Sequence, residues 1–455
     1  MQSAKPKIGF VGTGNMGRPL IERLLKAGYE VQAHDINPEH ASSVVVLGAS
    51  WKDTPALCAS TCQIVVTCLP LPHHVLENMT GDNGALSGMS EGSVWIDTST
   101  TDYHNTLHIA KLAKQKNIFS LEAPVSNLSH MGVDFANVCF YIGGDEPGYR
   151  LSQTMLETMG RKSFYVGKIG YGQSVKLLTN LLFYAATAVW AELLVMAKAN
   201  DIPLHWLWDF VKTSRGNCFV SSQLTPFMLD GSYDHSCTLE ITVKDMSLTV
   251  ALADELGVEI PLGRIIAQRY NQAGLLFDSQ ENHVKVAALS ERENNIRLNI
   301  PGFYAPSPYG ANRAYRHSGD LVEDAMGRIT PKLAPKFQSN STLTDSSKIK
   351  LASHLVEFLA CINKTILVEA WQIGRAMGLS DSLIEQVVNW SCGPSWIAEN
   401  LNIYEPCFDS IAVIEKLQQK LHLPVIEKIF QQSLLSNPSP TYPIGNRIRD
   451  GVAAP

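Results

Sequence analysis

The sequence predicts two architectures in one chain: an α/β domain with a doubly wound, mainly parallel sheet, followed by an all-α domain that is present twice. Three observations lead to this prediction. A glycine-rich turn follows the first apolar stretch, strand-like and helix-like stretches alternate as far as residue 165, and beyond it apolar residues recur almost only at helical spacing. A chain of 455 residues is long enough for two or three domains.

The opening unit, residues 8–26, carries the strongest motif. An apolar run from residue 8 to 11 reads as a short buried strand, and residues 19–25 repeat apolar side chains at helical spacing. A G-x-G-x-x-G turn between a strand and a helix lets the backbone approach a pyrophosphate, and the amides at the helix start favour its charge. The turn consists of Gly12, Thr13, Gly14, Asn15, Met16 and Gly17.

The second strand of this unit ends at Asp35, roughly 20 residues past the glycines, where an acid can bind the 2′-hydroxyl of a ribose. We therefore predict that residues 1–165 form a Rossmann domain that binds a dinucleotide; a purely structural glycine turn is the alternative. The other segments of this domain are expected as strands over 64–69, 93–97, 119–125 and 138–142, and as helices over 38–47, 73–79 and 106–116.

From about residue 166 the pattern becomes helical. A glycine-rich entry leads into a long helix over residues 173–200, and we predict an all-α catalytic and dimerisation domain over 166–290. Residues 291–345 read as an ordered connecting segment, with a plain linker as the alternative, and residues 436–455 as an extended tail.

Residues 346–435 are predicted to be a second, degenerate all-α domain. Glu369 lies 177 residues after Glu192, and the same offset relates several further pairs of identical residues. Because the identity is low, two unrelated amphipathic helices with similar spacing are the alternative. The further pairs include Val388 with Val211, Ser391 with Ser214 and Gly393 with Gly216.

Composition favours a globular protein with small-molecule partners. The net charge of −6 and the scattered basic residues offer no surface for nucleic acid or an anionic membrane. Nine scattered cysteines and an N-terminus without an apolar signal core favour reduced thiols and a cytoplasmic location, and no spacing typical of a metal site occurs. The most apolar helical stretch, residues 177–191, is shorter than the ~18 residues of a membrane span, so a core helix is expected.

Polar residues that interrupt the apolar helices are candidates for chemistry. Lys176 lies at the start of the long helix, where partly apolar surroundings would help a lysine to exchange a proton near neutral pH. Asn180 follows one turn later on the same face and could bond a substrate hydroxyl or the ammonium. Taken alone, a surface lysine and a surface amide are the simpler interpretations. Lys244 and Asp245 interrupt a later helix, and could reach the cleft or form an exposed pair.

Hydroxyl groups near strand ends form a second set of candidates. Ser126 follows a predicted strand, and open α/β sheets bind ligands at the carboxyl ends of their strands. Ser99 and Thr100 are placed in the same way. A hydroxyl with free backbone amides could hold a carboxylate there, but an ordinary strand-end turn explains these residues equally well. Glu122 could be a cleft acid, although a hydrogen-bonded strand-end carboxylate is the simpler interpretation.

These motifs together resemble the β-hydroxyacid dehydrogenase family, which includes 3-hydroxyisobutyrate and tartronate semialdehyde dehydrogenases and is related to 6-phosphogluconate dehydrogenase. The resemblance covers about residues 6–290 and implies hydride transfer between NAD(P) and a short β-hydroxyacid. The motifs that carry it are the glycine turn, residues 68–70, 96–100, 123–126 and 167–180, and the pair Lys244 and Asp245.

The resemblance also implies roles for individual residues. Lys176 would be the general acid/base and Asn180 its partner, while Ser126 and Asn127 would contact the substrate. Because no arginine follows Asp35, NAD is favoured over NADP. In shorter relatives the helical domain is the dimer interface, which implies a homodimer. The remaining cofactor contacts would be Leu69, Pro70, Thr100 and Lys244, the last also reaching the substrate.

The sequence departs from the family in two places. The family follows the substrate-binding serine with two glycines, whereas Asn127 and Leu128 stand here, so a different or a lost substrate is expected. In the second helical copy Ser353 and Glu357 stand opposite Lys176 and Asn180, so that copy would be a packing module. An imine-reducing member of the superfamily and a cofactor-binding protein with little turnover are the alternative functions. The glutamate acid of decarboxylating relatives is also missing, since Leu182 and Phe183 occupy its positions.

Overall fold

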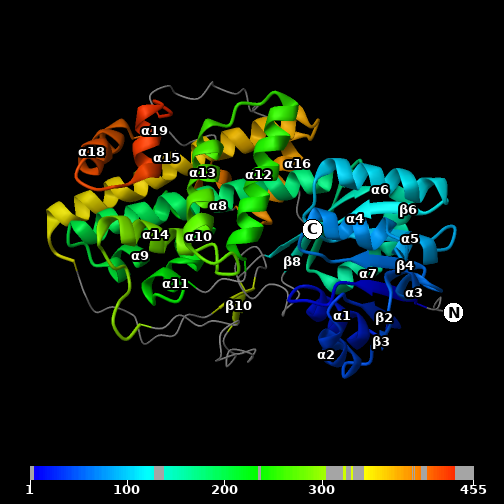
Figure 1. Cartoon of the computed structure of the whole chain (residues 1–455). Helices are drawn as coiled ribbons and strands as arrows, with labels where there is room; N and C mark the ends of the chain where they lie inside the picture. Colours follow the sequence, from blue (N-terminus) through cyan, green and yellow to red (C-terminus); the bar gives the residue numbers. More distant parts are fainter. Residues whose placement is uncertain are drawn as a thin grey trace, which may run out of the picture.

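The computed structural model describes residues 5–127, 138–233, 237–303, 321–323, 329–331, 343–391, 393, 395–400 and 407–435. Figure 1 shows an α/β body built from the N-terminal part of the chain and a helical body built from the rest, with helix α8 (Tyr171–Ala199) leading from the first into the second. Residues 128–130, most of the predicted connecting segment and the predicted tail lie outside the described residues.

The α/β body is built on a mainly parallel sheet. Its strand order, in the part of the chain that is described, is β3-β2-β1-β4-β5-β6-β8-β7, with β9 paired to β8. The order β3-β2-β1-β4-β5-β6 is that of a Rossmann fold, so the predicted fold class is confirmed. The strands are β1 (Ile8–Val11), β2 (Val31–His34), β3 (Ser50–Trp51), β4 (Ile64–Thr67), β5 (Val94–Asp97), β6 (Phe119–Glu122), β7 (Val125–Asn127), β8 (Val138–Gly144) and β9 (Lys162–Gly167).

The sheet differs from the prediction in detail. The strand predicted over residues 119–125 is two strands, because Pro124 has no N–H to donate to a ladder. Within the described residues β7 pairs with β8, and this pair is antiparallel, as is β8 with β6. As a consequence Ser126, which the sequence placed beyond a strand end, lies inside the short strand β7 opposite Cys139.

Helices cover both faces of the sheet, as a doubly wound sheet requires. α1 and α7 bury Leu20, Leu24 and Leu156 against one face, and α3 to α6 bury Val75 and Ile109 with the residues of the other. The bounds are α1 (Gly17–Lys26), the 3-10 helix η1 (Pro38–His40), α2 (Ala41–Val45), α3 (Pro55–Ala59), α4 (Pro72–Thr80), α5 (Ala85–Gly88), α6 (Tyr103–Gln115) and α7 (Glu146–Met159).

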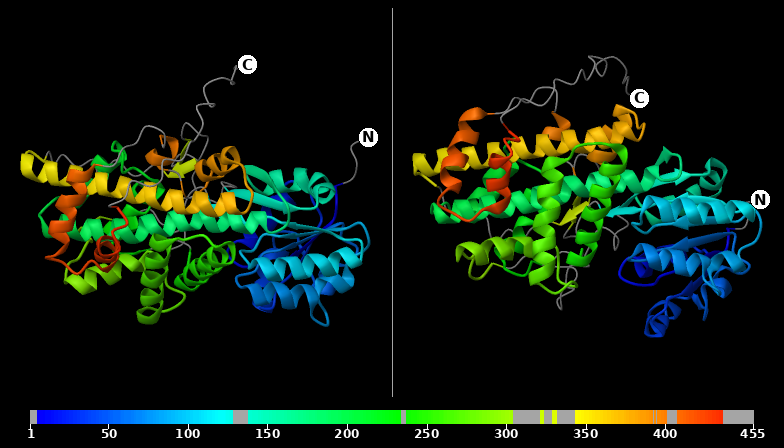
Figure 2. Two further views of the ribbon diagram at one scale, coloured as in Figure 1. Left: turned by 90° about the horizontal axis from the view of Figure 1, so that it is seen from above. Right: turned by 45° about the horizontal axis from the view of Figure 1, so that its top comes forward.

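The helical body is organised around two long helices, α8 and α15 (Ser346–Ala376), which lie side by side (Figure 2). Both are long and apolar enough to cross a membrane, but the most apolar window of α8 is 100% buried inside the protein, as expected for a core helix. The others are α9 (Leu204–Lys212), α10 (Phe219–Gln223), α11 (Thr225–Leu229), α12 (Leu239–Leu256), α13 (Pro261–Leu276), α14 (Lys285–Asn294), α16 (Asp381–Asn389), α17 (Trp396–Glu399), α18 (Phe408–Gln418) and α19 (Pro424–Gln431).

The internal repeat is visible in local structure at the offset of 177 residues. Helices α9 and α16 begin and end at equivalent positions, and so do the last residues of α8 and α15. The hydroxyl of Ser214 donates to the Val211 carbonyl at 2.8 Å, and that of Ser391 donates to the Val388 carbonyl at 2.7 Å. The two segments thus share these features of local structure at the same offset.

The two copies also contact each other reciprocally. Glu192 on α8 accepts hydrogen bonds from the first amides of α19, at Val425 (3.0 Å) and Ile426. Glu369 on α15 accepts from the first amides of α13, at Leu262 (2.8 Å) and Gly263. Each copy therefore supplies the buried carboxylate that caps a helix of the other, because the first amides of a helix have no partner within it.

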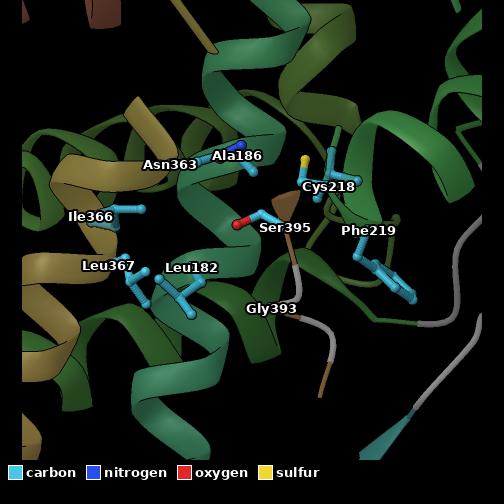
Figure 3. A pocket seen from close by; sticks show the side chains of 10 residues that line it. Leu182, Ala186, Cys218, Phe219, Asn363, Ile366, Leu367, Gly393 and Ser395 are labelled. Atoms are coloured by element: carbon cyan, nitrogen blue, oxygen red, sulfur yellow. The ribbon is translucent and has the colours of Figure 1, made fainter. Parts of the chain in front are cut away.

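A small cavity lies between the two copies (Figure 3). Leu182 and Ala186 of α8 line it on one side, and Asn363 and Ile366 of α15 face them. Cys218, which forms an antiparallel bridge with its equivalent residue Ser395, closes one end. None of the residues that line this cavity belongs to the predicted site.

Candidate active site

The glycine turn leaves space for a ligand at the start of α1. Gly12 has a φ of 101°, which favours glycine, and a Cβ on Gly12 would collide with the Cys68 carbonyl oxygen. A Cβ on Gly17 would collide with the Gly12 carbonyl oxygen, whereas one on Gly14 would meet no atom within 4 Å. The open side of Gly14 is where a Rossmann domain holds the pyrophosphate, so these residues fit a dinucleotide. The next residues, Asn15 and Met16, are exposed and half-buried, respectively.

Asp35 follows β2 and is fixed by the same turn. Its Oδ2 accepts hydrogen bonds from the amide (2.7 Å) and the hydroxyl of Thr13, and its Oδ1 accepts from the amide of Asn37 at 3.0 Å. Burial acts to raise the pKa of the Asp35 carboxyl, but these bonds, with His40 nearby, outweigh it and lower the pKa. The ionised carboxylate is suited to accept hydrogen bonds from ribose hydroxyls.

The predicted cofactor contacts beyond β4 and β5 lie on neighbouring loops, because these strands are adjacent and parallel. The amide of Leu69 donates to the Ser99 hydroxyl at 2.9 Å, which ties the two loops together. Asp97 supports this arrangement by accepting from the Ser99 amide at 3.1 Å. Pro70 and Thr100 are the next residues of the two loops, so the carboxyl edge of the sheet carries both.

Two buried side chains attach the start of α8 to this edge. Glu122, at the end of β6, accepts a hydrogen bond from the Gly172 amide at 2.6 Å. Burial raises the pKa of the Glu122 carboxyl to about 8, although the amides at the helix start act in the opposite direction. Gln173 donates to the Ser99 carbonyl at 2.8 Å and accepts from the Thr101 amide at 3.1 Å. Glu122 is therefore a hydrogen-bonded strand-end carboxylate, the simpler of its two interpretations.

Lys176 lies on α8 one turn beyond these anchors, and Asn180 lies one turn further. Lys176 is 9% exposed, so it is not a surface lysine, and Asn180 is 4% exposed. The pKa of the Cys237 thiol is raised, first by burial and then by the Asp245 carboxylate, while the Lys176 charge acts to lower it. The Cys237 thiol also lies 3.4 Å from the hydroxyl of Tyr184, one turn after Asn180.

The side chains of Lys244 and Asp245 are largely buried, so they are not an exposed pair. The ammonium of Lys244 donates to the Thr100 carbonyl at 2.6 Å and to the Pro70 carbonyl at 3.3 Å. Asp245, which is 2% exposed, accepts from the side-chain amide of Asn180 at 2.7 Å. The helix α12 thus connects the edge of the sheet to the polar face of α8.

The structure describes the surroundings of the predicted substrate residues, Ser126 and Asn127, less completely than those of Lys176 and Asn180. Ser126 is fully buried, and its hydroxyl has no hydrogen-bond partner within the part of the chain that is described. The backbone of Asn127 pairs with Val138 in β8, and the loop that begins with Leu128 lies outside the described residues. Because Ser126 is 0% exposed, its placement does not show a ligand contact, and the substrate role of both residues stays a prediction.

Sequence reasoning did not include two residues in the site. Asp245 was noticed only as part of a charged pair, and Tyr184 was not considered, although it stands one turn after Asn180 in an apolar helix. The spacing Lys176, Asn180, Tyr184 places all three on one face of α8, and this was the available signal. What their side chains contact could only be read from the tertiary structure.

Two family models match consecutive parts of the chain. Residues 7–167 match the NAD binding domain of 6-phosphogluconate dehydrogenase, and residues 170–290 match the NAD-binding region of NADP-dependent 3-hydroxyisobutyrate dehydrogenase. A probable mitochondrial 3-hydroxyisobutyrate dehydrogenase of Arabidopsis thaliana is 31% identical over 274 residues, which cover 56% of this chain and 79% of the relative. The chain belongs to the β-hydroxyacid dehydrogenase family. It is therefore an NAD(P)-dependent dehydrogenase or reductase that acts on CH–OH groups.

Other similar proteins agree with this assignment. The 3-hydroxyisobutyrate dehydrogenase of Pseudomonas aeruginosa is 30% identical over 265 residues, 57% of this chain and 89% of the relative. Among solved structures, the Mycobacterium tuberculosis 3-hydroxyisobutyrate dehydrogenase has a TM-score of 0.58 at 25% identity and covers 63% of this chain and 99% of its own. The 6-phosphogluconate dehydrogenase of Plasmodium falciparum, 14% identical, has a TM-score of 0.63 over 96% of this chain and 94% of its own, so the likeness of fold extends over the second helical copy.

Proposed function

We propose that this dehydrogenase transfers a hydride between a nicotinamide cofactor and a small β-hydroxyacid, of the kind represented by 3-hydroxyisobutyrate or tartronate semialdehyde. The observation that carries the proposal is the burial of Lys176 at the start of α8, where Gln173 ties the helix to the carboxyl edge of the sheet. A hydroxyl held at this edge would meet the lysine ammonium and the open ligand space of the glycine turn together.

In this proposal each residue of the site has its own role. The bound nicotinamide supplies the hydride acceptor or donor. Lys176 takes the hydroxyl proton during oxidation and returns it during reduction, and Asn180 orients the same hydroxyl. The buried hydroxyl of Ser126 contacts the acid group of the substrate, with Asn127 beside it. Lys244 holds the loops of Pro70 and Thr100 against α12, which keeps the cofactor and substrate sides together.

We further propose NAD as the preferred cofactor, with NADP as the second possibility. The ionised Asp35 accepts hydrogen bonds well, and a 2′-phosphate beside it would meet a like charge. Relatives named as NADP-dependent exist in the family, so the preference has to be measured. Titration of the purified protein with NADH and NADPH, followed by nicotinamide fluorescence, should give the lower Kd for NADH; a lower Kd for NADPH would contradict the assignment.

The activity is tested by a panel of hydroxyacids and semialdehydes offered with NAD and NADP to the wild type and to Lys176→Ala. We expect turnover of at least one three- or four-carbon substrate, and a loss of roughly 10²-fold or more in kcat for Lys176→Ala. Ser353→Ala, which changes the equivalent position of the second copy, should remain within about twofold of the wild type. A Lys176→Ala variant with full activity would remove the lysine from the mechanism.

A further inference from the structure

Three neighbouring strands carry a row of side chains that faces the helical body. Ser126 on β7 lies directly opposite Cys139 on β8, and Cys139 in turn is the partner of Lys162 on β9. Directly paired residues project from the same face of a sheet, so these three side chains point the same way. Cys139 belongs to the hydrophobic core of the helical body, which identifies the face that the row occupies.

The end of α16, in the second helical copy, lies on this row. The Cys139 thiol donates a hydrogen bond to the backbone carbonyl oxygen of Trp390 at 2.9 Å. The Lys162 ammonium lies 5.6 Å from the centre of the Trp390 ring, within the range of a cation–π contact. Trp390 therefore contacts two members of the row, and Ser126 is the direct neighbour of one of them.

The chain that follows Trp390 lies on α8. A Cβ on Gly393 would come within 2.8 Å of Cδ1 of Leu182, so the backbone at Gly393 lies close to this side chain. Leu182 stands on the same helix as Lys176, six residues later. Trp390 and Gly393, three residues apart, thus touch the sheet on one side and the helix of the proposed acid/base on the other.

We propose that Trp390 is a positioning residue supplied by the second copy, which holds Cys139 and so sets the place of β7 relative to α8. β7 has three residues, and within the described residues it pairs with β8, so whatever holds Cys139 also holds Ser126 and Asn127. The second copy is then more than a packing module. The inference rests on the proposed function, in which these two residues of β7 meet the acid group of the substrate.

The test weakens this contact in steps, in the full chain. W390A removes the ring beside Lys162, W390F keeps an aromatic ring there, and C139A removes only the thiol that donates to the carbonyl at position 390. W206A is the matched control, because Trp206 is also a half-buried tryptophan of the helical body but stacks on Phe210 of its own helix.

We expect W390A to raise KM for the best hydroxyacid about tenfold and to change kcat by less than about threefold, because substrate binding is weakened while the reacting atoms stay beside the lysine. C139A should raise KM about two- to fivefold, the size expected for one hydrogen bond. W390F and W206A should stay within about twofold of the wild type. The KM of C139A/W390A should equal that of W390A within about twofold, because both changes act on one contact. The Kd for NADH should stay within about twofold throughout.

Hydrogen exchange provides a second measurement that needs no substrate. Peptides that cover residues 121–127 and 138–144 should take up deuterium at least about threefold faster in W390A than in the wild type, because β7 and β8 lose their contact with the second copy. The same peptides should be unchanged in W206A.

The possible outcomes separate this inference from the proposed function. An unchanged KM in W390A overturns the inference, whether or not exchange becomes faster, while the proposed function survives. A loss confined to kcat overturns it in the same way. If the wild type turns over no hydroxyacid, the proposed function fails and this inference with it. If a melting curve shows that W390A does not fold, C139A decides by the same criteria.

Discussion

The two helical copies share one backbone plan but use it differently. α8 begins at the edge of the sheet and carries Lys176 and Asn180, whereas α15 carries Ser353 and Glu357 at the equivalent positions. Glu357 binds Arg215 of the first copy at 2.8 Å instead of facing a cleft. Chemistry thus depends on what the start of a long helix meets: α8 starts at residues bonded to the carboxyl edge of the sheet, whereas the second copy touches the α/β domain elsewhere, through Trp390 beside Cys139.

The helices α12 and α13 of the first copy also differ from α18 and α19 of the second. α12 has 18 residues and reaches the Rossmann domain through Lys244, whereas α18 has 11 residues. α13 has 16 residues and α19 has 8. In the described residues, the later helices of the second copy are therefore shorter than those of the first. Four predictions test how far this division holds.

The largest effect is expected from removing the second copy. We propose that residues 346–435 bury a face of the first copy that a partner subunit covers in shorter relatives. A chain ending after Asn294 would expose Leu182 and Ala186 of α8, which line the cavity opposite α15, and should aggregate or change its oligomeric state. Sedimentation and binding of a hydrophobic dye measure this. A soluble, folded fragment in the oligomeric state of the full chain would contradict the proposal.

The next largest effect is expected from substitutions at two equivalent positions, Asn180 in the first copy and Glu357 in the second. Asn180→Ala should lower kcat by about 10²-fold, because the amide that orients the reacting hydroxyl is lost. Glu357→Ala removes only an ion pair that is partly exposed, so it should leave kcat within about twofold. Steady-state kinetics with the best hydroxyacid decide between the two. Similar losses in both variants would mean that the second copy takes part in catalysis.

The reciprocal caps should make smaller, matched contributions to stability. Glu192→Ala and Glu369→Ala each leave two helix amides without an acceptor in the interior, and each should lower the free energy of unfolding by about 1–3 kcal/mol. Glu192→Ala should cost more, because the Arg269 guanidinium, 3.9 Å from Glu192, also loses a neighbour. Urea denaturation measures both variants. A neutral result for one of them would show that the copies are not held together reciprocally.

The smallest effect is a dependence of stability on pH. Burial raises the pKa of Glu192 and of Glu369 to about 7. Unfolded glutamates release their protons near pH 4.5, so between about pH 5 and 7 the folded state binds more protons than the unfolded state, and the free energy of unfolding falls as the pH rises. The urea midpoint should fall over this range in the wild type and fall less in E192Q/E369Q. If the urea midpoints of the wild type and of E192Q/E369Q fell equally with pH, these two glutamates would not be the cause of the pH dependence.

Much of the fold follows from local patterns. The glycine turn, its strand and its helix form a contiguous unit, so the pattern that predicts them lies within one stretch of residues. The repeat was visible because equal structures require similar spacing of apolar residues. The break at Pro124 could have been read from its missing N–H, but the predicted strand ran across it.

The sequence predicted only those parts of the site whose residues lie close together along the chain. Lys176 and Asn180 lie one turn apart on one helix, so their shared face followed from the sequence. Their contacts with Asp245 did not, because 65 residues separate Asn180 from Asp245 along the chain. Tyr184 was missed for the same reason, since a tyrosine in an apolar helix is ordinary until its hydroxyl is found beside a carboxylate.

By itself the sequence determined the cofactor turn, the two-part architecture, the duplication and the lysine at the start of the long helix, since each depends on residues near in the chain or on a repeated period. Only the tertiary structure decided which carboxylate orients Asn180, which helices Glu192 and Glu369 cap, and how α12 bridges sheet and α8. Hydrogen bonds between distant segments depend on how those segments pack together, and the spacing of residues along one segment does not show which other segment it will meet.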